Sequence, residues 1–405
     1  MFLLVGASIR ALLESAVESG YPVMGIDFFG DLDSRWSGKT VGIVNDLNLD
    51  PTVQNLLQVA QRETCQGLVY ASGPENHPEE LAFWEERGLL YGNGISVLRR
   101  VRDPWQLSQA LAKIGAAMPR FYGVEQWRSA ETEKKWLLKP LDRGGGHGIL
   151  ELPQDVKVAR ELISGLGNPS RYIVEEYISG IPASVTFLAD GREAVVLGTS
   201  RQLTGRQGVN RQPFIYAGNI VPFDNSLLPG FQSLEEEMIR IIIHLTSVFG
   251  LRGINTLDFI VNTSGVWVLE LNPRWSASVE LIEKWRGERL FSHHIAACNA
   301  KGMDQFHFSR HGRKPVQMHG LQGFWGKSIV YAQSSFQVTA DSDMHSLYEQ
   351  GVRDIPFAGT RIERGQPICT VLADAASDAD CWQTLQTKSQ WARRIFGDIK
   401  SSAAR

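Results

Sequence analysis

The sequence predicts a mixed α/β and α+β protein with three parts: an open parallel α/β domain over residues 1–95, a larger domain over residues 96–315, and a small β-rich domain over residues 316–398. Residues 1–28 read as strand, helix and strand, and the turn Asn262–Gly265 joins two β-rich runs. The last part consists of short β-rich runs separated by Gly and Pro. At 405 residues the chain is long enough for two to three domains.

The first domain begins with the strand Phe2–Gly6, the apolar-periodic helix Ile9–Ser19 and the strand Tyr21–Phe28. Gly67–Gly73 is a further buried strand. A glycine after a first strand is also typical of dinucleotide-binding folds, but the run GASIRA lacks the second and third glycines, so NAD binding is disfavoured. We expect instead that the carboxyl edge of this sheet contributes to a substrate cleft.

The stretch Leu98–Met118 is predicted to be helical, with Asp103 as an N-cap and Pro104 in a first turn. Three basic residues lie at the start of this stretch: Arg99, Arg100 and Arg102. One of them would contact a phosphate if this region lies beside a nucleotide. A solvated basic turn is the alternative interpretation.

A glycine-rich loop follows an apolar strand that ends on Lys139 and Pro140. Glycine reaches left-handed backbone angles at low cost and lets amide groups surround an anion, and the lysine adds a compact positive charge for terminal phosphates. The spacing is neither the Walker pattern nor GxGxxG opening a helix, and an ordinary hairpin turn is the alternative. The loop residues are Gly144, Gly145, Gly146, His147 and Gly148.

The elements around this loop follow from the same patterns. Residues 119–170 are expected to form a small lid that carries the loop. Tyr172–Ile178, Ala183–Leu188 and Ala194–Thr199 are predicted strands of the larger half, and Leu234–Phe249 is an amphipathic helix ahead of the final hairpin.

That hairpin carries two carboxylates and an amide. Asp258 lies in its first strand, while Glu270 and Asn272 lie two residues apart in the second and therefore share one face of the sheet. Burying such groups without a cation would be costly, and hard oxygen ligands suit Mg²⁺ that bridges nucleotide phosphates. A solvent-facing polar stripe is the alternative, but Arg274, which can clamp a phosphate or carboxylate with two donors, favours a metal site.

Together these segments resemble the ATP-grasp superfamily over roughly residues 90–300. The resemblance implies ATP as cosubstrate, with Lys139 and the glycine loop on the phosphates and Arg274 beside the reacting groups. It implies Mg²⁺, with Mn²⁺ as the alternative ion, held by Asp258, Glu270 and Asn272. The segment that matches the adenine-binding hinge consists of Glu175, Glu176, Tyr177 and Ile178.

A closer likeness is to predicted ATP-dependent carboligases that are related to biotin carboxylase and resemble tyramine–glutamate ligase of methanofuran biosynthesis. It depends on Ser200–Gln202, Phe214–Pro222, Asp354–Pro356 and Pro367–Val371. It implies that an acid such as glutamate is joined to an amine on a C1-carrier cofactor, namely methanofuran, methylofuran or a methanopterin.

Candidate substrate residues lie between the adenine hinge and the metal hairpin. They are Arg201, Gln202, Tyr216 and Asn219. Arg201 could hold a substrate carboxylate with two donors, and an ordinary polar loop is the alternative.

Composition limits the partners. The formal net charge of −3 argues against binding to nucleic acid or to an anionic membrane, and no apolar run approaches the ~20 residues of a membrane span. The chain starts directly with a strand and its four cysteines show no CxxC spacing, so we expect a cytoplasmic protein without structural zinc or disulfides. We expect small-molecule carboxylate and amine substrates and a homodimer.

The expected reaction is ADP-forming ligation, in which ATP activates a carboxylate as an acyl phosphate and an amine displaces the phosphate. Positioning and charge neutralisation suffice for this chemistry, and no Ser-His-Asp or Cys-His arrangement is discernible. A kinase acting on a small hydroxylated metabolite and a nucleotide-binding scaffold are the alternatives.

Overall fold

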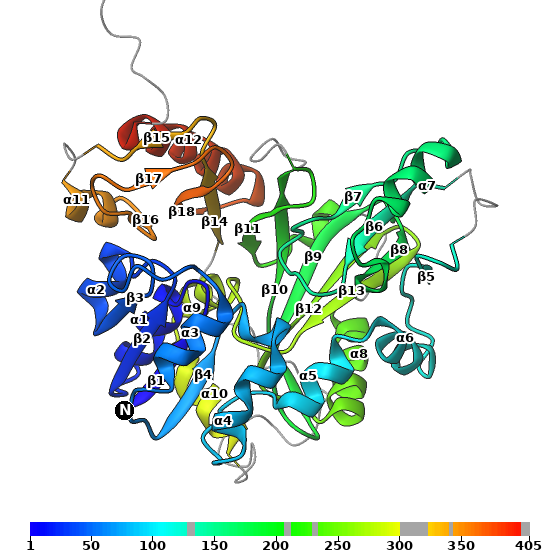
Figure 1. The fold of residues 1–405 in the computed structure, drawn as a ribbon, viewed down its shortest axis with the longest axis horizontal. Coiled ribbons are helices and arrows are strands. Elements are labelled where there is room, and N and C mark those ends of the chain that lie inside the picture. Colours follow the sequence, from blue (N-terminus) through cyan, green and yellow to red (C-terminus); the bar gives the residue numbers. More distant parts are fainter. Residues whose placement is uncertain (128–133, 206–211, 229–233, 300–322, 340–342, 398–405) are drawn as a thin grey trace, which may run out of the picture.

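The computed structural model describes residues 1–127, 134–205, 212–228, 234–299, 323–339 and 343–397. The N-terminal part is a parallel sheet of order β3-β2-β1-β4, as predicted for an open α/β fold (Figure 1). Its core forms because β1 and β4 are buried along their whole length. The elements are β1 Phe2–Val5, α1 Arg10–Glu18, β2 Val23–Asp27, α2 Leu32–Ser37, β3 Thr40–Gly42, α3 Val53–Ala60, β4 Gly67–Tyr70, η1 Pro74–Asn76, η2 Pro78–Leu81 and α4 Ala82–Glu85.

The predicted helical stretch Leu98–Met118 is two helices, α5 Ile95–Val101 and α6 Pro104–Ala112. The Asp103 carboxylate accepts hydrogen bonds from the amides of Trp105 and Gln106, so the N-cap prediction is confirmed. The prediction of one continuous helix is wrong, because Pro104 has no N–H that could continue α5, and it starts a new helix instead.

A four-stranded sheet of order β5-β8-β6-β7 forms the lid. Its elements are β5 Phe121–Gly123, β6 Trp136–Pro140, β7 Leu150–Glu151, α7 Val156–Ser164, η4 Pro169–Arg171 and β8 Tyr172–Glu176. The segment Tyr172–Ile178 was predicted to lie in the larger half, and this assignment is wrong. Strand β8 pairs with β5 and β6 inside the lid. A period-two pattern marks a strand but does not say which sheet it joins.

The central sheet has eight strands in the order β13-β12-β9-β10-β11-β14-β18-β16. The strands predicted at Ala183–Leu188 and Ala194–Thr199 lie within β9 and β10, and helix α8 has the predicted bounds. The elements are β9 Ile181–Asp190, β10 Ala194–Thr204, β11 Tyr216–Val221, η6 Asn225–Leu227, α8 Leu234–Phe249, β12 Arg252–Asn262, β13 Gly265–Asn272, α9 Val279–Arg286, α10 Phe291–Cys298, β14 Phe324–Tyr331, β16 Val352–Arg353 and β18 Pro367–Ala375.

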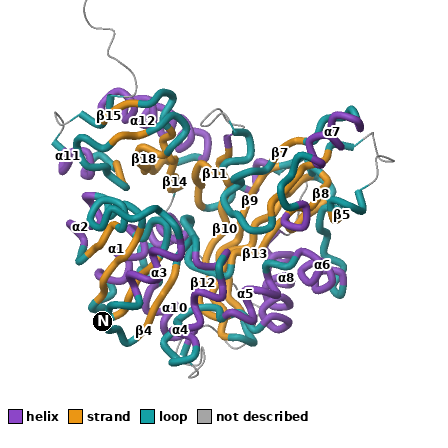
Figure 2. The backbone as a smooth tube through the Cα atoms, in the orientation of Figure 1, coloured by secondary structure: helices purple, strands orange, loops and turns teal. Residues whose placement is uncertain are grey.

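The C-terminal strands β14, β18 and β16 extend this central sheet instead of forming a sheet of their own. They keep a separate core beneath helix α12, which spans Asp378–Phe396. A small two-stranded sheet, β15 Phe336–Gln337 with β17 Arg361–Ile362, and helix α11 Met344–Glu349 complete the region. Figure 2 shows these elements on the side of the molecule away from the lid.

The two faces of the central sheet differ in character. One face packs on α8 and α6 through apolar side chains such as Val185, Phe187 and Leu257. The opposite face is apolar toward α9 and α10 and polar toward the lid, where Asp258 lies. The site is therefore positioned at the polar end of this second face. Among the described residues, no helix has the length and apolar character needed to cross a membrane.

Candidate active site

The glycine loop connects β6 to β7 and lies against the segment that leads into β11. Gly145, Gly146 and Gly148 have positive φ angles of 62°, 77° and 79°. A Cβ on Gly146 would lie 1.9 Å from the carbonyl oxygen of Phe214, so only glycine fits there. Among the described residues, the amide groups of Gly145 and Gly146 have no hydrogen-bond acceptor. The loop therefore offers donors to an anion, as the sequence predicted.

Lys139 links the lid to the central sheet. Its Nζ lies 3.4 Å from Glu175 Oε2 and 3.9 Å from Glu270 Oε2, and its side chain is 15% exposed. Burial alone would lower the pKa of Lys139, but Glu175 and then Glu270 outweigh it and raise that pKa. Lys139 therefore stays positively charged between two segments that lie far apart in the sequence.

The predicted metal residues come together on the hairpin. Asp258 lies opposite Glu270 in the β12–β13 pair, and its Oδ2 accepts a hydrogen bond of 2.8 Å from Asn272 Nδ2. Burial, and then repulsion from Glu270, raises the pKa of Asp258 to about 8. Lys139 and two nearby arginines outweigh burial at Glu270 and lower its pKa. The two carboxyl groups therefore do not both ionise readily unless a cation is added between them.

The donor set fits Mg²⁺ held jointly with a nucleotide. The described residues contain no cluster of three or more His, Cys, Asp or Glu side chains placed to hold a metal ion. Asp258 and Glu270 supply two carboxylates and Asn272 an amide oxygen, which are hard ligands. Mg²⁺ usually takes one or two carboxylates and fills its remaining positions with phosphate oxygens and water, so the set is sufficient only when a nucleotide is bound.

Arg274 is held from three sides next to the metal residues. Its Nε donates to Glu75 Oε1 at 2.6 Å, its Nη2 donates to Asn272 Oδ1 at 3.1 Å, and its Nη1 donates to the carbonyl of Trp275 at 3.3 Å. Glu75 belongs to η1 of the N-terminal part and is 1% exposed. The sequence analysis missed Glu75, because 199 residues separate it from Arg274 and no spacing rule connects them.

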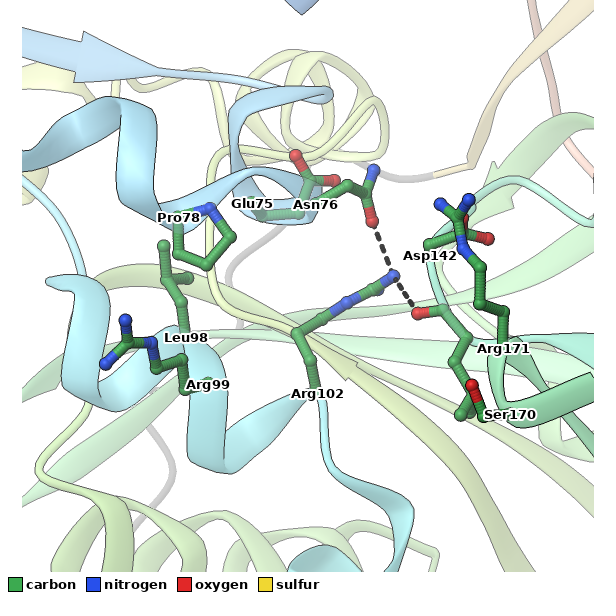
Figure 3. A pocket seen from close by; sticks show the side chains of 10 residues that line it. Glu75, Asn76, Pro78, Leu98, Arg99, Arg102, Asp142, Ser170 and Arg171 are labelled. Atoms are coloured by element: carbon green, nitrogen blue, oxygen red, sulfur yellow. Dashed lines mark hydrogen bonds and ion pairs between the residues drawn. The ribbon is translucent and has the colours of Figure 1, made fainter. Parts of the chain in front are cut away.

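Of the three arginines near α5, only Arg102 reaches the glycine loop. Its Nη2 donates to Asn76 Oδ1 at 2.5 Å and to the carbonyls of Leu141 and Arg143 at 3.2 and 3.1 Å. Arg99 makes an exposed ion pair with Glu79. Figure 3 shows the Arg99 side chain directed away from that of Arg102. Arg100 donates to carbonyls at the end of α8.

A pocket of about 250 Å³ lies beside Arg102, between the N-terminal part and the lid. Its lining residues are Glu75, Asn76, Pro78, Leu98, Arg99, Arg102, Leu141, Asp142, Ser170 and Arg171. The pair Asp142–Arg171 and the pair Arg99–Glu79 balance their own charges, whereas Arg102 contacts neutral acceptors. Arg102 therefore makes no ion pair among the described residues, but its positive charge is close enough to help lower the pKa of Glu270.

Three of the four predicted substrate residues lie near the hairpin, and the fourth, Arg201, does not. Gln202 Nε2 donates to Asp258 Oδ1 at 2.8 Å, which places Gln202 at the metal residues. Tyr216 bonds through its hydroxyl to Asn219 Oδ1, and Asn219 Nδ2 donates to Ser200 on the same sheet. Gln202 lies opposite Asn219 in the β10–β11 pair, so these three side chains form one polar group beside the hairpin, in which Asn219 is buried.

Arg201 does not join that surface. Neighbouring residues of a strand point to opposite faces, and the Arg201 guanidinium makes a two-bond ion pair of 2.9 and 2.7 Å with Asp378 at the start of α12. The expectation that Arg201 holds a substrate carboxylate is therefore corrected: in this structure Arg201 fastens α12 to the central sheet.

The predicted adenine hinge lies at the end of β8. The Glu175 side chain faces Lys139, and burial outweighs that lysine and raises the pKa of Glu175. Glu176 pairs with Arg120 at 2.9 Å and with Lys134 at 2.6 Å. Tyr177 donates its amide to the carbonyl of Lys135, and Ile178 is half-buried. The Glu175 side chain thus belongs with Lys139. Hydrogen bonding of adenine by the backbone that follows Glu175 stays a prediction.

The family model of the ATP-grasp domain matches residues 101–278. These bounds include the lid, the glycine loop, the metal hairpin and Arg274. The chain contains an ATP-grasp domain.

Two sequence relatives match this chain at low identity. An uncharacterized protein of Methanocaldococcus jannaschii is 22% identical over 92% of this chain and 87% of its own length. The arginine-specific large chain of carbamoyl phosphate synthase from Bacillus subtilis is 23% identical over 60% of this chain, and the match spans 24% of that longer protein.

Two solved structures share the architecture at low identity. The biotin carboxylase domain of Hydrogenobacter thermophilus 2-oxoglutarate carboxylase, a dimer in complex with MgADP and bicarbonate, has a TM-score of 0.69 at 15% identity, covering 96% of this chain and 88% of that one. The L-amino acid ligase from Bacillus licheniformis has a TM-score of 0.66 at 15% identity and covers 96% of both chains. At this identity the likeness establishes the fold.

Proposed function

We propose that this protein is an ATP-dependent, ADP-forming carboxylate–amine ligase that acts through an acyl phosphate. One observation carries the proposal: the lid and the hairpin place Lys139 within 3.9 Å of Glu270, beside Asp258 and Asn272. A cation donor for phosphates and a set of hard metal ligands thus share one site. The relatives that include an L-amino acid ligase and carbamoyl phosphate synthase support the same reaction class.

The chain's own side chains account for binding and orientation. Lys139 and the amides of Gly145 and Gly146 would hold the phosphates, and Arg102 adds positive charge where the loop meets α5. Mg²⁺ held by Asp258, Glu270 and Asn272 would neutralise the transferring phosphoryl group, and Mn²⁺ is the alternative ion. Arg274 donates to Asn272 next to these ligands and would bind an anionic group of the reaction there.

The proposed reaction has two balanced steps. A carboxylate oxygen of the acid attacks the γ-phosphorus of ATP, and the bond to the β-phosphate oxygen breaks to release ADP. An amine nitrogen then attacks the acyl carbon, phosphate leaves with the bond's electron pair, and the amine loses a proton. Positioning and electrostatic stabilisation can supply most of the rate enhancement in such transfers, so no nucleophilic side chain is needed.

The likeness to tyramine–glutamate ligase extends the proposal to the substrates. Glutamate or a similar acid would be joined to an amine on a C1-carrier cofactor. Gln202, Tyr216 and Asn219 would contact the substrates, since they form one polar group next to Asp258. We also propose a homodimer, the form named for the biotin carboxylase domain with the same fold.

Hydroxylamine trapping tests the reaction class. The purified protein is incubated with Mg²⁺, ATP, hydroxylamine and a panel of amino acids and small carboxylic acids. An acyl-phosphate ligase should release ADP and form a hydroxamate with at least one acid. Release of AMP and pyrophosphate would contradict the acyl-phosphate scheme.

A small-molecule kinase is the second candidate, because the same phosphate and metal residues serve phosphoryl transfer to a hydroxyl. A kinase product would be a phosphate ester, which does not react with hydroxylamine. ADP release without hydroxamate, in the presence of a hydroxylated metabolite, would therefore favour the kinase. Absence of turnover together with tight MgADP binding would favour a nucleotide-binding scaffold.

A further inference from the structure

Glu75 is the buried group nearest to Arg274 that belongs to another part of the fold. It lies in η1, directly after β4, and its Oε1 accepts from Arg274 Nε at 2.6 Å while its Oε2 accepts from the amide of Gly73 at 2.5 Å. Both carboxylate oxygens are thus fixed, and the side chain is 1% exposed. A charge-assisted bond to Nε fixes the plane of a guanidinium, because that nitrogen lies inside the rigid fork.

The backbone that carries Arg274 is fastened to the same part of the fold. The carbonyl of Pro273 accepts hydrogen bonds from Tyr70 Oη at 3.2 Å and from Asn93 Nδ2 at 3.0 Å. Tyr70 is at the end of β4, and Asn93 precedes α5. The N-terminal part therefore holds this backbone through Tyr70 and Asn93, and among its described residues Glu75 is the one that binds the guanidinium.

Given the ligase function proposed above, we propose that Glu75 is a positioning residue for Arg274. By binding Nε, Glu75 leaves the two terminal nitrogens without a carboxylate partner: Nη2 donates to Asn272 beside the metal residues, and Nη1 donates to the carbonyl of Trp275. Each terminal nitrogen keeps a second N–H that can donate to an anion. An anionic group of the reaction, either the acid's carboxylate or the transferred phosphate, would be bound there. The N-terminal α/β part thereby completes the ATP-grasp site with one carboxylate.

A double-mutant cycle on the full-length protein tests this role. The four proteins are wild type, Glu75→Gln, Arg274→Gln and the double variant. Inorganic phosphate is titrated calorimetrically into each protein after saturation with MgADP, and MgADP affinity and melting temperature are measured separately. Tyr70→Phe serves as the matched control, because it removes a hydrogen bond from the same contact and leaves the Glu75–Arg274 pair.

We expect each single variant to weaken phosphate binding about 10-fold, and the double variant to be no weaker than Arg274→Gln alone. MgADP affinity should stay within about 2-fold of wild type, since Lys139 and the glycine loop are unchanged. Each single variant leaves one buried charge unpaired, so the double variant should melt above Arg274→Gln without regaining phosphate affinity. Tyr70→Phe should bind phosphate as wild type does.

Three results would overturn the role of Glu75: additive losses of phosphate affinity, a parallel loss of MgADP affinity in Glu75→Gln, or a loss in Tyr70→Phe as large as in Glu75→Gln. Absence of phosphate binding to the wild-type MgADP complex would also overturn it. A protein that forms no hydroxamate but shows the expected cycle would lose the ligase assignment and keep the positioning role, so the two failures are distinguishable.

Discussion

Two groups of charged side chains in this protein have similar members, two cations and three carboxylates each, but pair them differently. The first, which we call the Arg10 network, consists of Arg10, Glu14, Glu280, Lys327 and Asp354. Arg10 donates to Glu280 at 2.7 and 2.9 Å, to Glu14 at 3.1 Å and to Asp354 at 2.9 Å, and Lys327 Nζ lies 3.0 Å from Glu280. The second, the metal-side cluster, consists of Lys139, Glu175, Asp258, Glu270 and Arg274.

The pKa shifts of the carboxyl groups separate the two. In the Arg10 network, Arg10 and Lys327 outweigh the burial of Glu280 and hold its pKa well below the ordinary value. In the metal-side cluster, burial and then repulsion raise the pKa of Asp258 to about 8. The first group pairs each of its carboxylates directly with Arg10 or Lys327 and joins α1, α9 and β14. In the second, the Asp258 carboxylate is bonded among the described residues to the side-chain amides of Gln202 and Asn272 and to no cation, and such a carboxylate is typical of a site that receives a cation.

The largest expected effect comes from breaking the Arg10 network. Glu280→Gln leaves Arg10 and Lys327 with less negative charge in a buried setting, and loss of one partner from such a pair costs ~3–5 kcal/mol. We expect urea unfolding to show this loss of stability, with MgADP affinity within about threefold of wild type. The double variant Glu280→Gln/Lys327→Met removes one charge of each sign and should recover part of the stability. Unchanged stability in Glu280→Gln would contradict a structural role for the network.

The sequence predicted most of the metal-side cluster and none of the Arg10 network. Lys139, Asp258, Glu270 and Asn272 occur in local patterns, a glycine loop and a hairpin, whose spacing restricts the geometry. Arg10 and Glu280 are 270 residues apart, and each lies in an amphipathic helix where a charged residue ordinarily faces solvent. Local pattern reveals a site residue only when its neighbours in the chain take part in the same site.

The same limit explains the two wrong placements. Strand β8 was predicted correctly as a strand but assigned to the wrong sheet, and Arg201 was expected on the substrate side but pairs with Asp378. In both cases the partner comes from a distant segment that the sequence pattern does not identify. Glu75 was missed for this reason as well.

The next effect concerns the metal-side cluster itself. Glu270→Gln keeps the shape of the side chain and removes the charge that a metal pair would need, so we expect turnover to fall at least ~10²-fold. The fold should survive, because the change removes repulsion from Asp258 when no metal is bound.

Asn272→Ala should weaken Mg²⁺ use less than Glu270→Gln does, and Lys139→Ala should weaken ATP binding. Steady-state kinetics at limiting Mg²⁺ checks this, with exposed Glu151→Gln as control.

Near-normal turnover of Glu270→Gln at limiting Mg²⁺, with normal melting behaviour, would contradict a metal site. The polar residues of the hairpin would then have a structural role, like those of the Arg10 network.

A third prediction uses a buried group outside both clusters. His294 Nδ1 accepts a hydrogen bond from the amide of Ile254, and its Nε2 contacts the carbonyl of Tyr91. Burial lowers the pKa of His294 to about 4. Its ordinary value is 6.5, so between these two pH values the unfolded chain binds a proton that the folded chain does not. Stability from His294 is therefore present above pH 6.5 and is lost as the pH falls toward 4.

Between pH 7.5 and 5.5 this loss should amount to about 1.4 kcal/mol, one pKa unit of differential protonation. Urea unfolding of wild type and of His294→Gln at the two pH values isolates it as the difference between their pH dependences. A pH dependence that is the same in both proteins would show that His294 is not held neutral by burial.

The smallest expected effects come from two arginines of one helical turn. Comparing their substitutions tests which of them contributes to ATP binding. Arg102 donates to the carbonyls of Leu141 and Arg143 at the glycine loop, whereas Arg99 makes an exposed pair with Glu79, with side chains 62% and 60% exposed. Arg102→Ala should raise the KM for ATP about 5-fold, because it removes positive charge beside the phosphate loop. Arg99→Ala should change the KM by less than about twofold and leave the stability of the protein unchanged, since exposed ion pairs contribute little. Raising the salt concentration should shrink the difference between the two variants only slightly, because Arg102 is partly shielded from solvent. Equal KM values for both variants would place Arg102 with the structural charges and leave Lys139 as the phosphate-binding cation.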